Sequence, residues 1–127
     1  MSKSKEFEDK VRQLIYAKWG VKLEEKAVNI GNVAGCEMKF DYVSTTDSKF
    51  DGCFAGDAKD YNVKRNFSAE KSGISEYVWL LQKVDAVHKF LVFRGNRQIP
   101  ESWLRRWRSL AEGIEFYFVE DNELVRL

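Results

Sequence analysis

The amino-acid sequence predicts an α/β domain in which a mixed β-sheet is flanked by helices. Segments with an apolar period near 3.6 residues alternate with short segments that are apolar at every second position or throughout, as helices and strands require. The chain has 127 residues, 44% of them hydrophobic and 14% aromatic, enough for one sizeable core. No linker, repeat or low-complexity tract interrupts it, so we expect residues 1–127 to form a single domain.

The first half of the chain predicts a helix followed by three strands. The helix spans residues 4–19, with Gly20 as its C-cap. Its core-facing stripe comprises Phe7, Val11, Leu14 and Ile15. Strands are expected over residues 26–30, 37–44 and 50–61, the last two paired as a hairpin. Because side chains alternate along a strand, one face of the second strand is expected to carry Met38, Phe40 and Tyr42, and the other Lys39, Asp41 and Val43.

The second half predicts two helix–strand units. A helix over residues 66–86 precedes a short apolar strand at 89–93, which suits a central position covered on both faces. Pro100 is expected at the first position of a helix over 101–112, and a strand follows at 114–119. The predicted order is therefore α-β-β-β-α-β-α-β, with residues 124–127 folding back after a turn.

Charge and cysteine content exclude several functional classes. Lysine and arginine total 21 and aspartate and glutamate 20, so the chain is not a uniformly basic nucleic-acid binder. Cys36 and Cys53 make no disulfide framework, and with one histidine they argue against a zinc site. No signal peptide follows Met1 and no apolar run is long enough for a membrane span, so we expect a cytoplasmic protein without membrane contact.

Three charged residues of the predicted hairpin are candidates for a functional site. Asp57 and Lys59 are two residues apart in one strand and therefore share a face. A turn centred on Ser48 and Lys49 would place Asp41 opposite Asp57, and cross-strand neighbours lie within about 5 Å. Two carboxylates so close raise each other's pKa unless a cation lies between them.

This pattern suits metal-assisted phosphodiester hydrolysis. Mg²⁺ binds one or two carboxylates, keeps water ligands and leaves room for a phosphate. Lys59 beside such an ion would polarise or deprotonate the attacking water, or neutralise developing charge on the phosphate. We therefore expect Asp41, Asp57 and Lys59 to form the catalytic core of a hydrolase.

The sequence resembles the PD-(D/E)xK nuclease superfamily, which has the restriction-endonuclease-like fold. The match is Phe40-Asp41, fifteen intervening residues and Asp57-Ala58-Lys59, within an element order that covers nearly the whole chain. The resemblance implies that Asp41, Asp57 and the Ala58 carbonyl hold Mg²⁺ or Mn²⁺, that Lys59 is catalytic and that Glu8 of the first helix supports the metals. Phe40 stands where the motif has proline, and Asp57 where glutamate is more frequent.

The resemblance also implies an endonuclease, with DNA the more frequent substrate and RNA the alternative. Because a bare core offers little surface for sequence readout, we expect it to act on structures or junctions, to work as a homodimer or to borrow specificity from a partner. Trp79 and Leu80 lie off the main stripe of the second helix and are candidates for a subunit contact.

Cations near the start of the second helix are candidates for nucleic-acid contact. Lys64 and Arg65 precede the helix, and Lys71 and Ser72 follow in its first turns, where phosphates are favourably bound. A solvated loop explains the same residues equally well.

Simpler interpretations stay open for the acidic site. Asp41, Asp57 and Lys59 would also fit a salt-bridge cluster on a solvated sheet face, and Glu8 a first-turn glutamate that favours the helix dipole. A non-catalytic nucleic-acid or protein binding module on the same fold is the second hypothesis. An unrelated α/β domain that binds a small ligand is the third.

Overall fold

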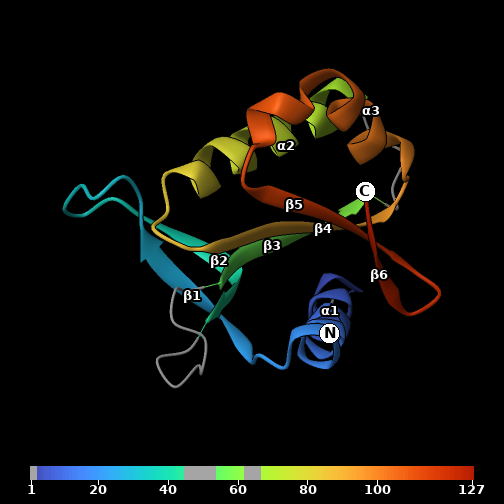
Figure 1. The fold of residues 1–127 in the computed structure, drawn as a ribbon, viewed down its shortest axis with the longest axis horizontal. Coiled ribbons are helices and arrows are strands. Elements are labelled where there is room, and N and C mark those ends of the chain that lie inside the picture. Colours follow the sequence, from blue (N-terminus) through green and yellow to red (C-terminus); the bar gives the residue numbers. More distant parts are fainter. Residues whose placement is uncertain (1–2, 45–53, 62–66) are drawn as a thin grey trace.

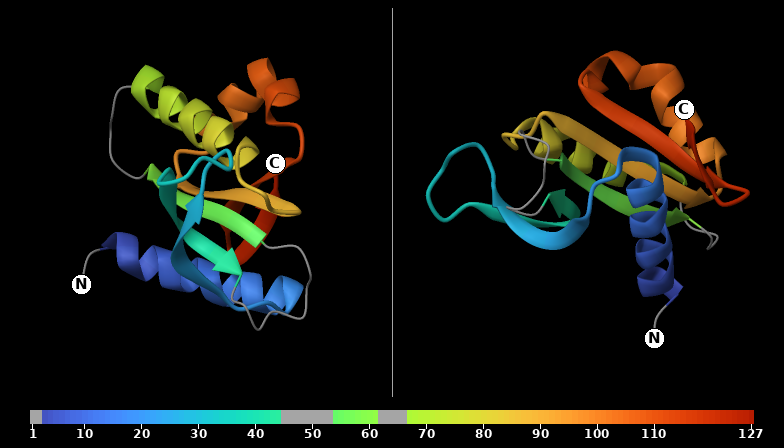
Figure 2. Two further views of the ribbon diagram at one scale, coloured as in Figure 1. Left: turned by 90° about the vertical axis from the view of Figure 1, so that its left-hand side faces the viewer. Right: turned by 60° about the horizontal axis from the view of Figure 1, so that its bottom comes forward.

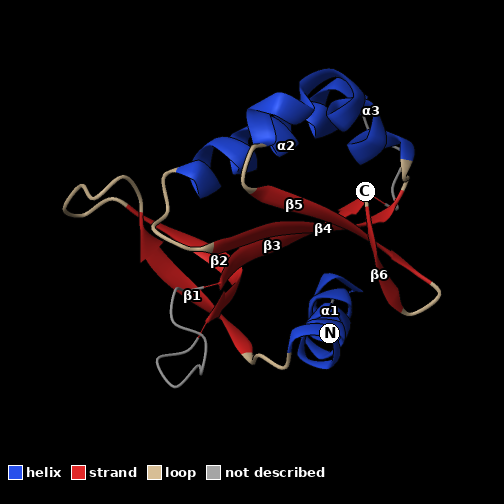
Figure 3. Cartoon of the chain, viewed as in Figure 1, coloured by secondary structure: helices blue, strands red, loops and turns tan. Residues whose placement is uncertain are grey.

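The computed structural model describes residues 3–44, 54–61 and 67–127, which form a six-stranded sheet between two helical layers (Figure 1). One helix covers one face, and two helices cover the other (Figure 3). The helices are α1 (Lys3–Trp19), α2 (Phe67–Gln82) and α3 (Gln98–Trp107), with a 3₁₀ turn, η1 (Arg108–Ala111), after α3. The strands are β1 (Leu23–Asn29), β2 (Glu37–Ser44), β3 (Phe54–Tyr61), β4 (His88–Gly95), β5 (Ile114–Glu120) and β6 (Glu123–Arg126).

The sheet is mixed, and its strands lie in sequence order from β1 to β6. β1, β2 and β3 pair antiparallel, whereas β3, β4 and β5 pair parallel and β6 returns antiparallel to β5. Parallel neighbours need a crossover connection, which α2 and α3 supply. The predicted α/β class with a mixed sheet and helices on both faces is thus confirmed.

Two hydrophobic cores hold the layers together. Beneath α2 and α3 the core is built around Ile74, Leu81, Leu91, Phe93 and Trp103, all almost fully buried. On the opposite face, Val11 and Ile15 of α1 pack with Tyr42, Phe90 and Val92. β4 is buried from Phe90 to Phe93 because both cores cover it, as the short apolar run predicted.

A β-bulge in β2 corrects the predicted faces of that strand. Glu24 pairs with Val43 and Lys26 with Phe40, so β2 has two residues, Asp41 and Tyr42, where β1 has one. Tyr42 therefore packs on the α1 face, while Phe40 and Val43 both pack beneath α2. The expectation that Tyr42 shares a face with Phe40 was wrong, because uniform alternation does not allow for an extra residue.

Several boundaries also differ from the predictions. α3 begins at Gln98 rather than at residue 101, and Pro100 fits inside its first turn because those N–H groups have no helical partner. The segment after Trp107 tightens into η1 instead of continuing the helix to residue 112, and Leu110 within it is 59% exposed. α2 ends at Gln82 instead of 86, and β1 begins at Leu23 instead of 26. The predicted turn at 45–48 and the start of the strand at 50–53 lie outside the described residues.

Within the described residues, no helix combines the length and the apolar character that a membrane crossing demands.

Candidate metal centre

Carboxylates from two neighbouring strands meet where β2 and β3 separate. Tyr42 pairs with Gly56, so the register places Asp41 opposite Asp57. The Asp41 backbone N–H donates to Oδ1 of Asp57 at 3.0 Å, and the Ala58 N–H donates to Oδ2 of Asp41 at 3.1 Å. Each carboxylate thus replaces a backbone carbonyl as acceptor for the other strand, which fixes both side chains.

Lys59 completes the β3 part of the cluster. Its Nζ lies 3.0 Å from Oδ2 of Asp57, and that aspartate is only 4% exposed. The ammonium also lies over the ring of Tyr77 on α2, 3.3 Å from the ring centroid. Lys59 is therefore held between an anion and an aromatic face.

Contacts between α1 and the strands bring Glu8 to the same place. The buried Tyr42 hydroxyl donates to the Glu8 backbone carbonyl at 2.9 Å. Arg12, one turn further along α1, donates to the Leu23 carbonyl at 2.9 Å and approaches the Asp41 carbonyl at 3.4 Å. Burial raises the pKa of Tyr42 far above its ordinary value, so its hydroxyl remains a donor.

Gly56 lets the sheet pack closely beside the aspartates. A Cβ at this position would lie 2.6 Å from the ring of Phe90, which is completely buried. The residue before Asp57 therefore has to be glycine, because the ring has no room to withdraw.

Crowding of the carboxylates perturbs their titration. Burial, followed by the hydrogen bond and the charge of Asp41, raises the pKa of Glu8 to about 7. Burial also raises the pKa of Asp57 to about 7, with the Lys59 charge opposing the rise and the Asp41 charge adding to it. Burial is the largest single effect on Lys59 and would lower its pKa, but the charge and hydrogen bond of Asp57 together with the contact to Tyr77 outweigh it, so the net direction is upward. Lys59 is accordingly an ammonium ion at neutral pH.

The structure adds Glu25 to the cluster, which the sequence reasoning missed. Oxygen atoms of Glu8, Glu25 and Asp41 lie within 4.8 Å of one another. Glu25 also pairs with Lys39, at 3.0 Å. A signal was present, because a β1–β2 turn centred on Val33 would place Glu25 opposite Asp41.

Oxygen ligands of this kind fit Mg²⁺ or Mn²⁺, which prefer carboxylates. Asp41 contacts Asp57 on one side and belongs to the group with Glu8 and Glu25 on the other. Glu8, Glu25 and Asp41 could hold the ion together, and Asp57 could join them from beside Asp41, with Lys59 nearby as a fixed positive charge. Exposed acidic groups are common without metals, and the buried Asp57 is not one of the three residues whose oxygens converge.

The remaining predicted site residues occupy different positions. Ala58 lies between Asp57 and Lys59 and anchors Asp41 through its N–H. Lys71 and Ser72 lie on α2 and line a notch that α2 forms with α3, facing Arg106 rather than the carboxylates. Lys64 and Arg65 lie outside the described residues.

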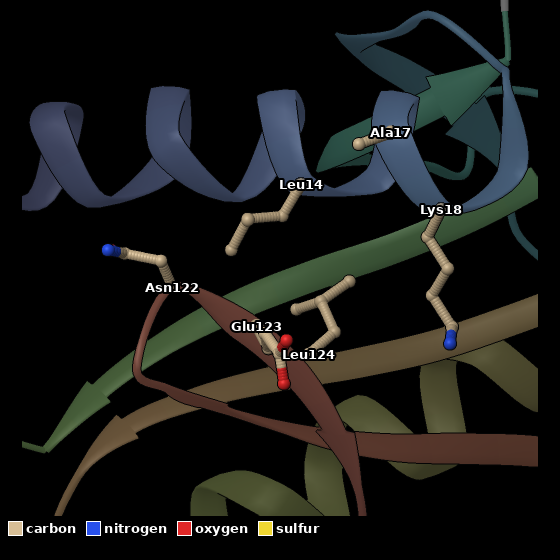
Figure 4. Close-up of a pocket in the computed structure, with 6 residues that line it drawn as sticks. All are labelled: Leu14, Ala17, Lys18, Asn122, Glu123 and Leu124. Atoms are coloured by element: carbon tan, nitrogen blue, oxygen red, sulfur yellow. The ribbon is translucent and has the colours of Figure 1, made fainter.

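Two larger concavities border α1, and neither Asp41 nor Asp57 lines them. One, of about 630 Å³, lies between α1 and the start of β1 and includes Arg12, Tyr16 and Leu23. The other, of about 330 Å³, lies between α1 and the β5–β6 turn, and Leu14 extends from α1 toward that turn (Figure 4). The acidic cluster is thus separate from both hollows.

Comparison of the chain with protein-family models, with curated proteins and with solved structures finds no match.

Proposed function

We propose that this protein is a Mg²⁺- or Mn²⁺-dependent nuclease that hydrolyses phosphodiester bonds at the cluster of Glu8, Asp41, Asp57 and Lys59. The observation that carries the proposal is the meeting of three carboxylates and one ammonium from α1, β2 and β3. The proposed endonuclease acts on DNA in preference to RNA, with structured or branched molecules as the expected targets.

A simple salt-bridge cluster explains this arrangement less well. The carboxyl group of Asp41 contacts those of both Glu8 and Asp57, whereas an ion-pair cluster would separate like charges with cations. Asp57 is also almost completely buried, and its pKa is raised although Lys59 and the Asp41 N–H both favour its charged form, so its charge is incompletely compensated. A divalent cation shared by the carboxylates would supply the missing compensation.

Each residue has a role that follows from its contacts. Asp41 and Asp57 would hold the ion, because each is already oriented by a backbone N–H of the other strand. Glu8, presented by α1, would support the ion from the opposite face. Lys59 donates hydrogen bonds to the phosphate or to the attacking water, since its raised pKa keeps it protonated. A bound Mg²⁺ would polarise the phosphate and acidify a water molecule.

A cleavage assay tests the proposal. Branched, single-stranded and duplex DNA, and RNA, are incubated with the protein in Mg²⁺, Mn²⁺ or EDTA. We expect metal-dependent cleavage that falls by roughly 100-fold or more in Asp57→Asn and in Lys59→Gln. Asp85→Asn and Glu6→Gln, which remove exposed carboxylates elsewhere, should retain wild-type activity.

The outcomes separate the hypotheses. Cleavage that survives both Asp57→Asn and Lys59→Gln would overturn the site assignment. Nucleic-acid binding without cleavage of any substrate would favour the non-catalytic binding module. Isothermal titration calorimetry that detects no uptake of Mg²⁺ or Mn²⁺ would exclude the metal.

A further inference from the structure

The notch between α2 and α3 concentrates positive charge outside the acidic cluster. It is lined by Lys71, Ser72 and Ser75 of α2 and by Arg106 and Trp107 of α3. Its volume is about 250 Å³, below that of a drug-sized pocket and suited to a small polar group. Of the described residues, two cations and two hydroxyl groups line it and no carboxylate does, which is a composition that favours an oxyanion.

Contacts inside the notch hold its α2 wall in place. Ser75 accepts a hydrogen bond from the indole N–H of the buried Trp103 at 2.8 Å. The Lys71 ammonium lies 3.4 Å from the Ser102 hydroxyl, which directs it across to α3. The notch is therefore a joint feature of the two helices rather than of one helix terminus.

Arg106 forms the α3 wall and is available to an incoming anion. Its guanidinium lies 5.1 Å from the centroid of the Trp107 ring. Among the described residues no carboxylate pairs with Arg106, whereas Arg97, at the start of α3, already binds Glu101 and Glu120. A cation–π contact with an indole uses the face of a guanidinium, so its N–H groups can still make bidentate contact with a phosphate.

α2, β3 and α1, which carry residues of the notch and of the acidic cluster, come together along one side of the molecule. In the left-hand view of Figure 2, the start of α2, the carboxyl end of β3 and the start of α1 follow one another along one side. α2 also links the two sites, because Lys71 lines the notch and the ring of Tyr77, six residues later, contacts Lys59.

We propose that the α2–α3 notch binds a backbone phosphate of the nucleic-acid substrate, at a distance from the phosphate that is cleaved. The ligand is a phosphodiester group of a strand that continues into the acidic cluster. This inference rests on the proposed nuclease function, because the notch would position the strand on which the cluster acts. Recognition by charge alone is independent of sequence, as expected for an enzyme that reads structure.

Binding measured separately from cleavage tests the inference. Fluorescence anisotropy of short labelled DNA and RNA strands, duplexes and branched DNA is recorded in Ca²⁺ at increasing salt. We expect the double variant Lys71→Gln/Arg106→Gln to weaken binding by about tenfold or more and to lower the slope of log K against log salt by about 1. In cleavage assays the same variant should raise KM and leave kcat nearly unchanged.

Two control variants separate loss of the notch from a general loss of positive charge. Arg105→Gln removes a neighbouring exposed cation that does not line the notch, and it should change binding much less. Lys71→Arg/Arg106→Lys keeps both charges and should restore most of the affinity. Circular dichroism of each variant establishes that it is folded.

The outcomes distinguish failure of the notch from failure of the nuclease. Wild-type affinity and salt slope in the double glutamine variant would overturn the notch and leave the nuclease proposal standing. Notch-dependent binding without metal-dependent cleavage would support the notch and reject the nuclease. Absence of any nucleic-acid binding, or notch-dependent binding of a phosphoserine peptide instead, would overturn the inference.

Discussion

Asp41 organises the acidic cluster through both its backbone and its side chain. Its N–H holds Asp57, its carboxylate accepts the Ala58 N–H, and the same carboxylate contacts Glu8. Three short interactions at one residue make the positions of the other carboxylates interdependent. A substitution at Asp41 would therefore alter the whole cluster, whereas changes at Glu8 isolate a single charge.

The raised pKa of Glu8 predicts a pH-dependent effect of Glu8→Gln on stability. Without metal, folded Glu8 keeps its proton up to pH values near 7, while in the unfolded chain it loses the proton near pH 4.5. Its stabilising contribution is thus present at low pH and disappears as pH rises through about 7. Glutamine cannot ionise, so the variant does not lose this stability. In EDTA, the Tm of Glu8→Gln relative to the wild type should therefore rise by roughly a few degrees from pH 5 to pH 8.

Thermal unfolding followed by circular dichroism measures this difference. Saturating Mg²⁺ should reverse the order, because the wild type then gains a ligand to the ion and the variant does not. Glu6→Gln, at an exposed position of the same helix, is the control for removing a carboxyl group outside the cluster. A constant difference for Glu8→Gln would contradict the expectation.

Residue positions were predictable where a turn set the register. The turn centred on residue 49 placed Asp41 opposite Asp57, and the observed pairing of Tyr42 with Gly56 has the same centre. Glu25 was missed because its approach to Asp41 depends on the pairing of β1, whose start was predicted three residues late. The Tyr77–Lys59 contact depends on how α2 packs, which periodicity alone does not specify.

At the scale of elements, the docking of α1 on the sheet positions one carboxylate of the cluster. Phe7, Val11 and Ile15 supply the apolar contact, and Tyr42 supplies a directed hydrogen bond at the turn that carries Glu8. Hydrophobic contact tolerates small sliding of a helix, whereas a buried hydrogen bond does not. The accuracy with which Glu8 is presented therefore depends on Tyr42.

Tyr42→Phe should consequently lower both stability and activity. Loss of the hydroxyl removes a buried hydrogen bond, which contributes about 1 kcal/mol to the free energy of unfolding. Urea denaturation measures that loss, and the cleavage assay should show reduced kcat because Glu8 is held less firmly. Tyr16→Phe, at an exposed position of α1, is the matched control and should be neutral. Wild-type kcat in Tyr42→Phe would show that α1 is positioned by its apolar stripe alone.

Elements themselves followed from periodicity, and their ends did not. β2 was predicted over residues 37–44 and is observed there, because its apolar alternation is bounded by turn residues. Helix ends depend on tertiary contacts. At the carboxyl end of α2, the Lys83 carbonyl accepts a hydrogen bond from the Gly31 N–H, in the connection between β1 and β2, at 2.8 Å. No pattern within α2 signals that partner.

At the scale of the whole molecule, the outer face of α2 is the candidate contact surface of the expected homodimer. Trp79 is 57% exposed on α2, on the helical layer remote from α1 (Figure 1). Sedimentation equilibrium of the wild type should show a dimer, and Trp79→Ser should shift it toward monomer. Val87→Ser, at a 79% exposed apolar position after α2, is the control for loss of surface hydrophobicity. A wild-type monomer would contradict the dimer.

The layered architecture was the most predictable property of the chain. Helix–strand alternation after residue 66 requires parallel strands with crossover helices, and right-handed crossovers leave few arrangements. The first helix then has to cover the opposite face, because the doubly apolar β4 cannot leave one face in water. Site geometry was less predictable, since it depends on one bulge.

The extra residue in β2 imposes a rule on which insertions and deletions the chain can accept. Lengthening the connection between β2 and β3 leaves the pairing of both strands intact. Deleting one residue between Phe40 and Val43 would restore regular pleating with β1 and compel Tyr42 to exchange faces. Asp41 and Tyr42 could not then both keep their positions. Relatives of this protein should therefore vary in the length of the β2–β3 connection and conserve the number of residues within β2.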